Sequence, residues 1–168
     1  MTGLAREGLH KDMYLWGMFS IFSDEYFMQQ AWREALLALE EGEVPVGAVV
    51  TCRQQIISRA HNQMERLNDV TAHAEMLAIT AAATHLGAKY LNQCCLYVTL
   101  EPCLMCAGAL AWSQLGELVI GAPDERRGFL QYGREVLHPA TVVRTEILAE
   151  ESRELLQRFF RERRAKKR

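Results

Sequence analysis

The sequence predicts an α/β domain in which one mixed five-stranded sheet lies between two layers of helices, as a three-layer α/β/α sandwich. Three observations lead to this fold class. The chain has 168 residues, which is enough for one domain with a substantial apolar core. Short runs rich in β-branched and aromatic residues alternate with longer segments whose apolar residues recur at helical spacing. Such alternation is typical of a sheet covered by helices on both faces.

Five segments have the composition of β-strands. Pro45 makes the beginning of the first segment irregular, because proline cannot donate to a strand ladder. The third segment is rich in β-forming residues and is expected to be central in the sheet. The predicted strands are residues 44–52, 55–60, 94–100, 117–122 and 141–147.

Four helices are expected between and after these strands. Ser23 is a suitable N-cap for the first helix, and Gly42 is expected to end it. Thr71 is the predicted N-cap of the second helix, and Pro102 suits the first turn of the third. The long connection over residues 123–139 is expected to border a binding site. The predicted helices are residues 23–41, 71–86, 103–115 and 150–164.

Charge is distributed unevenly along the chain, whose net charge is −2. Residues 158–168 contain seven basic residues and one acidic residue, so this end carries +6 and the remainder carries −8. A basic end on an acidic body permits contact with a polyanion, although a solvated helix end explains the same pattern. The candidate nucleic-acid contacts are Arg161, Arg163, Arg164, Lys166 and Lys167.

Cysteine usage and the N-terminal segment bear on the location of the protein. The chain has five cysteines and no secretory signature, which indicates reduced thiols and a cytoplasmic protein. Residues 13–22 are apolar but too short to span a bilayer, so no membrane partner is expected. Residues 1–22 are interpreted as an added N-terminal arm, either disordered or upstream of a true start at Met13 or Met18. Residues 23–168 are expected to form a single domain.

Two short motifs carry the chemistry. His73, Ala74 and Glu75 form one motif, and Pro102 introduces Cys103 and Cys106 in the other. Each motif alone is weak evidence for a catalytic site, because His-x-Glu occurs often by chance and Cys-x-x-Cys also occurs in redox pairs and structural zinc sites. Both motifs, however, begin a predicted helix. Two helix N-termini directed at one point would favour thiolates there through their free N–H groups.

The number of metal donors distinguishes a catalytic site from a structural one. His73, Cys103 and Cys106 supply three ligands, whereas zinc prefers four in a tetrahedron. One position therefore stays open, which is typical of catalytic zinc sites. Glu75 is then a carboxylate outside the ligand set that can take and deliver protons. The sequence predicts one Zn²⁺ ion with Glu75 as the catalytic residue.

The chain resembles the cytidine deaminase-like superfamily, and within it the bacterial tRNA adenosine deaminases that act at the wobble position. His-x-Glu with Pro-Cys-x-x-Cys is the signature of the zinc-dependent base deaminases. The likeness extends over residues 24–164 and includes residues 43–49, 71–75, 96–103, 105–109 and 159–161. It implies the sandwich fold, a homodimer with one zinc ion per subunit, and a tRNA anticodon loop as the partner.

The resemblance also implies roles for further residues around the base. It places a pocket wall at residues 44–47, a hydrogen-bond partner at Asn62 and a backbone contact at Ala74. It places the backbone of Pro102 and Cys103 where ammonia leaves. Phe129, in the loop beside the site, is included as a substrate contact. The predicted substrate-binding residues are Val44, Pro45, Val46, Gly47, Asn62, Ala74, Pro102 and Phe129.

The sequence is also compatible with three other functions. Phe129 and residues 112–114 differ from the family pattern. Together with the acidic body, they favour a deaminase of a free base or nucleoside, such as guanine, adenine or cytosine. A catalytically inactive zinc-binding module would keep the metal without turnover. Thiol–disulfide exchange by Cys103 and Cys106 is a further alternative, because Cys-x-x-Cys at a helix start suits it.

Overall fold

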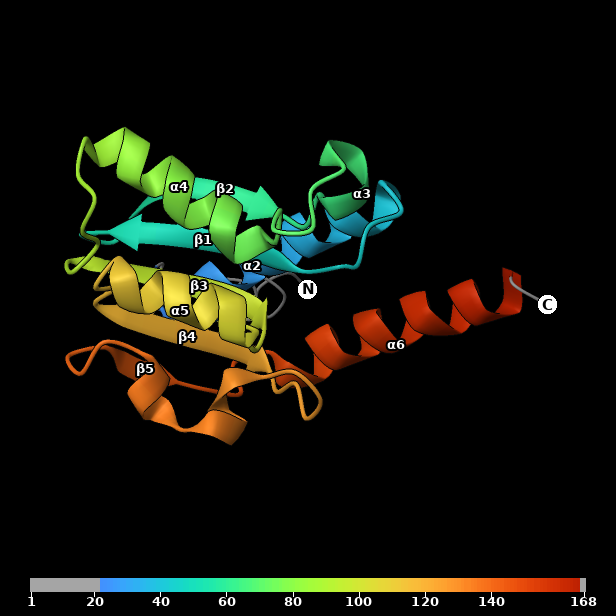
Figure 1. The fold of residues 1–168 in the computed structure, drawn as a ribbon. Helices are drawn as coiled ribbons and strands as arrows, with labels where there is room; N and C mark the ends of the chain where they lie inside the picture. Colours follow the sequence, from blue (N-terminus) through green and yellow to red (C-terminus); the bar gives the residue numbers. More distant parts are fainter. Residues whose placement is uncertain (1–21, 167–168) are drawn as a thin grey trace, which may run out of the picture.

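Five strands form one sheet of order β2-β1-β3-β4-β5 in the computed structural model, which describes residues 22–166 (Figure 1). β1 pairs antiparallel with β2 and β3, whereas β3, β4 and β5 run parallel to one another. This arrangement confirms the predicted mixed five-stranded sheet. The strands are β1 (Gly47–Cys52), β2 (Gln55–His61), β3 (Cys94–Leu100), β4 (Glu117–Ala122) and β5 (Val142–Arg144).

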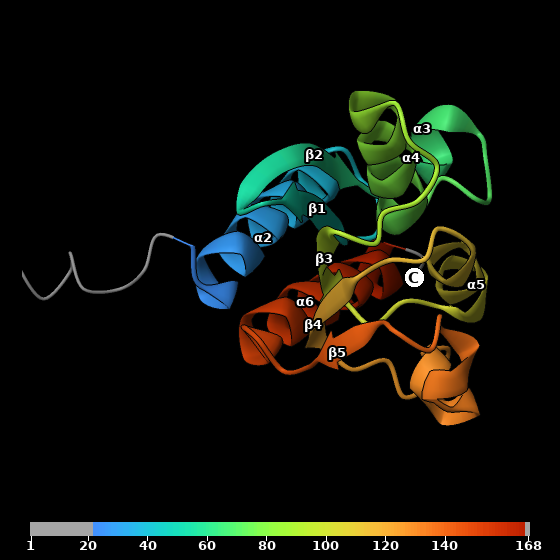
Figure 2. The same ribbon diagram turned by 90° about the vertical axis from the view of Figure 1, so that its left-hand side faces the viewer.

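Helices cover both faces of this sheet, as predicted (Figure 2). The inner strands β1, β3 and β4 are buried on both sides because alternate residues face opposite helix layers. Val50 and Leu96 pack in the cluster that includes α4 and α5, whereas Val49 and Tyr97 pack against α2. None of the helices within residues 22–166 is both long and apolar enough to cross a bilayer. The main helices are α2 (Asp24–Glu40), α4 (Ala74–Leu86), α5 (Leu104–Trp112) and α6 (Ala149–Lys166).

Several predicted boundaries differ from the structure. β1 begins at Gly47 and not at residue 44, because its partner strand β2 ends at His61, which pairs with Gly47. The predicted loop at residues 61–70 contains a short helix, α3 (Met64–Leu67). The connection at residues 123–139 contains two 3-10 turns, η1 (Phe129–Tyr132) and η2 (Arg134–Val136). The predicted arm lies outside the described residues except for Phe22, and so does Lys167.

The second helix begins later than predicted. His73, and not Thr71, is the N-cap of α4. Thr71 instead pairs with Asp69, whose Oδ1 accepts from the Thr71 backbone N–H at 2.8 Å and from its hydroxyl at 2.7 Å. These bonds close a local turn ahead of the helix, which competes with helical capping.

A polar network joins the first turn of α2 to the sheet. Asp24 Oδ1 accepts a hydrogen bond from the Tyr97 hydroxyl at 2.9 Å, and Asp24 Oδ2 accepts from Arg144 Nε at 2.7 Å. Arg144 Nη1 also donates to Glu117 Oε2 at 2.7 Å. Asp24 and Glu117 hold the pKa of the Arg144 guanidinium above its ordinary value. The network fixes α2 against β3, β4 and β5.

We expect Asp24→Ala to lower the free energy of unfolding by about 1–3 kcal/mol, because Tyr97 and Arg144 lose a charged acceptor. Urea denaturation would measure this change. Arg153→Ala is the matched control, because its partner Glu150 is exposed and surface ion pairs contribute about 0–1 kcal/mol. Equal effects of the two substitutions would contradict a stabilising role of the network.

Candidate functional site

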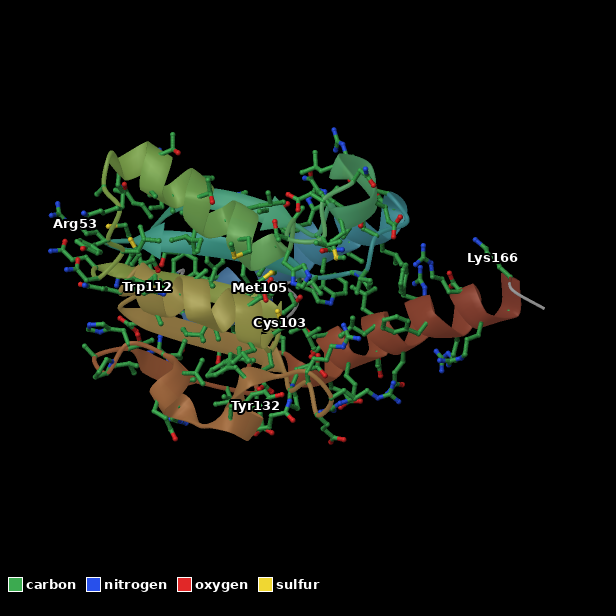
Figure 3. All side chains as sticks on the ribbon, in the orientation of Figure 1. Arg53, Cys103, Met105, Trp112, Tyr132 and Lys166 are labelled. Atoms are coloured by element: carbon green, nitrogen blue, oxygen red, sulfur yellow. The ribbon has the colours of Figure 1, made fainter. Side chains whose placement is uncertain are left out.

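Three predicted metal ligands meet at the N-terminal ends of α4 and α5. His73 and Cys103 are the N-cap residues of these helices, and neither makes a side-chain capping bond. His73 Nδ1 lies 3.7 Å from Cys103 Sγ and 3.5 Å from Cys106 Sγ. The three donor atoms lie within 4.8 Å of one another. Figure 3 shows Cys103 at the start of α5, where the first-turn amides give a positive potential.

The electrostatics of the two thiols fit a divalent cation. The hydrogen bond between the thiols lowers the pKa of Cys103 to about 4 and, in return, raises the pKa of Cys106. Without a cation the pair therefore shares one negative charge. A bound cation would allow both sulfurs to be thiolates, and one nitrogen with two sulfurs is a donor set that zinc prefers. Within residues 22–166 the group has three donors, which leaves one zinc position open.

Glu75 lies beside this group and is almost completely buried, with 4% of its surface exposed. Burial is the main cause that raises the pKa of its carboxyl to about 7. A carboxyl with such a pKa can both accept and donate a proton near neutral pH. Glu75 also faces a cavity, so this capacity is available to a bound ligand.

The cavity beside the metal ligands has a volume of about 500 Å³. This volume is within the range of small-molecule sites. Four of the predicted substrate-binding residues line it, namely Val44, Val46, Asn62 and Ala74. Sequence reasoning did not single out several other lining residues, which are Met64, Leu100, Glu101, Asp124, Arg126, Arg127 and Leu156.

Four other predicted substrate contacts do not line this cavity. Phe129 is fully buried in the apolar core, so its prediction as a substrate contact is corrected. Gly47 lies against α2, where an added Cβ would come 2.0 Å from the Ala31 carbonyl oxygen. Pro45 is buried. The Pro102 carbonyl accepts the backbone N–H of Phe129 at 3.0 Å, which fixes the loop beneath Cys103.

Two buried carboxylates that sequence reasoning gave no role shape the site. Glu43 Oε2 accepts from Asn62 Nδ2 at 3.2 Å, and Glu43 Oε1 accepts from the Arg66 backbone N–H at 2.8 Å. These bonds hold the Asn62 amide at the cavity wall, where its oxygen remains as an acceptor for a ligand. In the sequence, the only indication of this role of Glu43 is its position as a charged residue beside the apolar run 44–50.

Glu101 is the second such carboxylate, and it holds the loop after β4. Its Oε2 accepts the Asp124 backbone N–H at 3.0 Å, and its Oε1 accepts that of Leu130 at 2.8 Å. Gly128 allows this close approach, because an added Cβ would lie 2.2 Å from Glu101 Oε1. The loop is thereby tied to the strand end that leads into Cys103.

A second cavity of about 670 Å³ adjoins the first. The two share lining residues that include Leu100, Asp124 and Phe160. Four arginines line the second cavity, and they come from the loop after β4 and from α6: Arg126, Arg153, Arg161 and Arg164. Asp124 and Glu125 line it as well, so the site opens onto a groove in which positive side chains outnumber negative ones by two.

The predicted nucleic-acid contacts divide into two groups. Arg161 and Arg164 line the charged groove. Arg163 instead lies over the Phe159 ring, with its guanidinium carbon 5.2 Å from the ring centroid. Lys166 is exposed at the end of α6, which extends beyond the sheet (Figure 3).

Comparison with known proteins agrees with this geometry. Residues 22–122 match the family model of the cytidine and deoxycytidylate deaminase zinc-binding region. A tRNA-specific adenosine deaminase of Aquifex aeolicus is 48% identical over 141 residues, covering 82% of this chain and 93% of the relative. One of Bacillus subtilis is 46% identical, covering 86% and 92%. A solved tRNA:A34 deaminase superposes with a TM-score of 0.74 at 40% identity, covering 78% of this chain and 99% of that one.

Proposed function

Because the chain belongs to the zinc-dependent cytidine and deoxycytidylate deaminase family, we propose that it converts adenosine to inosine at the wobble position of a tRNA anticodon. The observation that carries this proposal is the cavity itself. It joins a His-Cys-Cys metal group and a buried carboxyl to an arginine-lined groove. The overall reaction replaces the 6-amino group of adenine by oxygen from water and releases ammonia.

The residues of this chain divide the chemistry among them. His73, Cys103 and Cys106 hold the zinc ion, which when bound supplies a Lewis acid for the activation of water. Glu75 takes a proton from the attacking water and returns one to the nitrogen that leaves. Asn62, held by Glu43, fixes the orientation of the base. The base must leave its stack to enter the cavity, at a cost of roughly a few kcal/mol.

The charged groove supports an RNA substrate over a free base. A base alone would fill only the cavity beside the metal ligands, and the adjoining groove would have no occupant. Its arginines are well suited to phosphate oxygens, and Phe160, 44% exposed, offers a ring for stacking of a neighbouring base. The groove therefore accounts for flanking nucleotides on one side of the target adenosine.

The substrate is tested by incubating zinc-loaded protein with tRNA that carries adenosine at the wobble position. Sequencing should then show an adenosine-to-guanosine change at that position alone. The same assay with free adenosine, adenine, guanine and cytosine should release no ammonia. Ammonia from a free base, without inosine in tRNA, would establish the alternative substrate class.

We expect the double substitution Arg161→Gln and Arg164→Gln to lower kcat/KM for tRNA by about tenfold or more at moderate salt. Two fewer phosphate contacts should also reduce the slope of log affinity against log salt concentration by about 1.4 to 1.8. Filter binding across a salt series would measure this slope.

Arg53→Gln is the control for the site of the change, because it makes the same replacement once at the opposite end of the molecule (Figure 3). The control should leave tRNA binding unchanged. An unchanged salt slope in the double variant would contradict the assignment of the groove to RNA.

A homodimer is the second part of the proposal. α5 begins at the metal site and exposes Leu104, Met105 and Trp112, the last of them 87% exposed. Met105 and Trp112 are seven residues apart and so lie on one face of the helix, as Figure 3 shows. A second copy of the chain would remove this apolar face from water.

Location in the cytoplasm follows from the tRNA substrate and from the thiolate ligands, which require reducing conditions.

We expect Trp112→Arg to shift the protein from dimer to monomer, because a charged side chain would be placed in the proposed apolar interface. Light scattering after size-exclusion chromatography would measure the mass. Trp112→Phe keeps the apolar contact and should remain dimeric. A monomeric parent protein would refute the proposed dimer.

A further inference from the structure

A second pair of thiols lies at the end of the sheet remote from the metal ligands. Cys52 is the last residue of β1 and Cys94 is the first residue of β3, and the two are direct partners in the antiparallel register. Both side chains point to the same face of the sheet, where Cys52 packs against the cluster that contains Cys94. In such pairs the Cβ atoms are about 4.5–5.5 Å apart.

The backbone of Cys94 shows that this is the closer kind of antiparallel pair. Its N–H donates to the Leu91 carbonyl at 3.0 Å, and its carbonyl oxygen lies beside Gly116, the residue before β4. Both backbone groups therefore face β4 and not β1. Pairs without mutual hydrogen bonds have Cα atoms about 4.5 Å apart. Disulfides span Cα separations from about 4.4 to 6.8 Å, so the pair fits at the short end of that range.

Small molecules have access to this pair through a cavity of about 430 Å³. Cys52 and Cys94 both line it, together with Arg53, His85 and Tyr90. Cys52 is partly exposed whereas Cys94 is 2% exposed, so an incoming reagent meets Cys52 first. Burial, followed by the charge of Cys52 and a hydrogen bond with its thiol, raises the pKa of Cys94 to about 12. Cys94 is thus suited to the second step of an exchange and not to the first.

We propose that Cys52 and Cys94 form a thiol modification site, which takes up a reversible cross-strand disulfide by exchange with a small-molecule disulfide of the glutathione class. The pair lies beside a two-residue hairpin turn, in which Arg53 and Gln54 have φ angles of 51° and 62° and join β1 to β2 directly after Cys52. Cys52 is partly exposed, and exposed disulfides are readily reduced, so the bridge would be reversible.

The exchange balances in two steps. The Cys52 thiolate attacks one sulfur of the small disulfide, forming a mixed disulfide and releasing one thiolate. Cys94 then loses its proton to solvent and attacks the Cys52 sulfur, which releases the second thiolate. Two protein thiols are oxidised, and one small disulfide is reduced to two thiols.

The test uses the zinc-loaded protein equilibrated with mixtures of reduced and oxidised glutathione and then quenched with an alkylating reagent. We expect the chain to lose two of its alkylatable thiols, with Cys52 and Cys94 recovered as one linked peptide and the zinc content unchanged. Reduction with excess thiol should restore both. A linked Cys103–Cys106 peptide with loss of zinc, or no linked peptide at all, would overturn the proposal.

Three variants define the site. Cys94→Ser should accumulate glutathione on Cys52, because the second step is lost, and Cys52→Ser should take up none. Cys95→Ser is the matched control, since Cys95 is adjacent in sequence but packs on the opposite face with α2. That control should form the bridge as the parent does. Equal glutathione uptake in the parent and in Cys94→Ser would show that Cys94 does not resolve the adduct.

Discussion

Replacing Glu75 by glutamine is expected to lower the rate of deamination by about 10²- to 10⁴-fold while the fold and the zinc content stay unchanged. Glutamine keeps the size of the side chain but cannot accept a proton at the pH of the reaction. Glu75 is 4% exposed and lines the substrate cavity, so bulk water offers no efficient substitute for its carboxyl. Since Glu75 is not one of the three donors, the metal group should remain complete.

Single-turnover rates on tRNA, with metal analysis of the same preparations, would measure this effect. Glu65→Gln is the matched control, because it makes the same chemical change at an exposed position in α3. The control should keep the parent rate. Full activity of Glu75→Gln, with zinc bound, would remove Glu75 from the proton transfer.

The inner strands β1, β3 and β4 were predictable from the sequence because they are buried almost throughout, whereas β5 is mostly exposed and covers only Val142–Arg144 of the predicted residues 141–147. Residues 94–100 and 117–122 are mostly apolar, interrupted only by Thr99 and Glu117, and β3 and β4 have these bounds in the structure. Residues 44–46 share that composition but lie outside β1, because a ladder needs a partner and β2 ends opposite Gly47. Composition cannot show where the partner strand ends.

The metal ligands were predictable because local spacing defines them. Cys103 and Cys106 are three residues apart at a helix start, which brings their sulfurs to one side. The roles of Glu43 and Glu101 were not predictable in this way. Their hydrogen-bond partners lie 19 to 29 residues further along the chain, so the fold alone reveals them.

Phe129 shows the limit of an inference from resemblance. It stands next to Gly128 in the loop beside the site, and proximity in sequence indicated a substrate contact. The structure instead ties its N–H to Pro102 and places its ring in the core. Gly128, the residue before Phe129, packs against Glu101. The direction of the Phe129 side chain therefore depends on a contact between segments that are distant in the sequence.

Loss of the metal is expected to have the second large effect. The two thiols hold one negative charge between them when no cation is present, because their hydrogen bond lowers the pKa of Cys103 and raises that of Cys106. Cys106 is fully buried, so a second thiolate there is unfavourable unless a cation neutralises it. Zinc therefore stabilises the ends of α4 and α5 in addition to its chemical role, and its removal should lower the melting temperature.

Cys106→Ala removes a zinc ligand. Loss of a residue that only hydrogen-bonds a ligand lowers metal affinity by roughly 10- to 100-fold, so we expect a larger loss of zinc affinity here. After zinc is removed from the parent protein with a chelator, added zinc should restore its activity and melting temperature. Added zinc should restore neither in Cys106→Ala. Cys95→Ala removes another buried thiol, outside the metal group, and should keep both zinc and activity. Calorimetric titration of the metal-free proteins would measure the affinities. Parent-like zinc binding by Cys106→Ala would mean that the ion is held by a different set of donors.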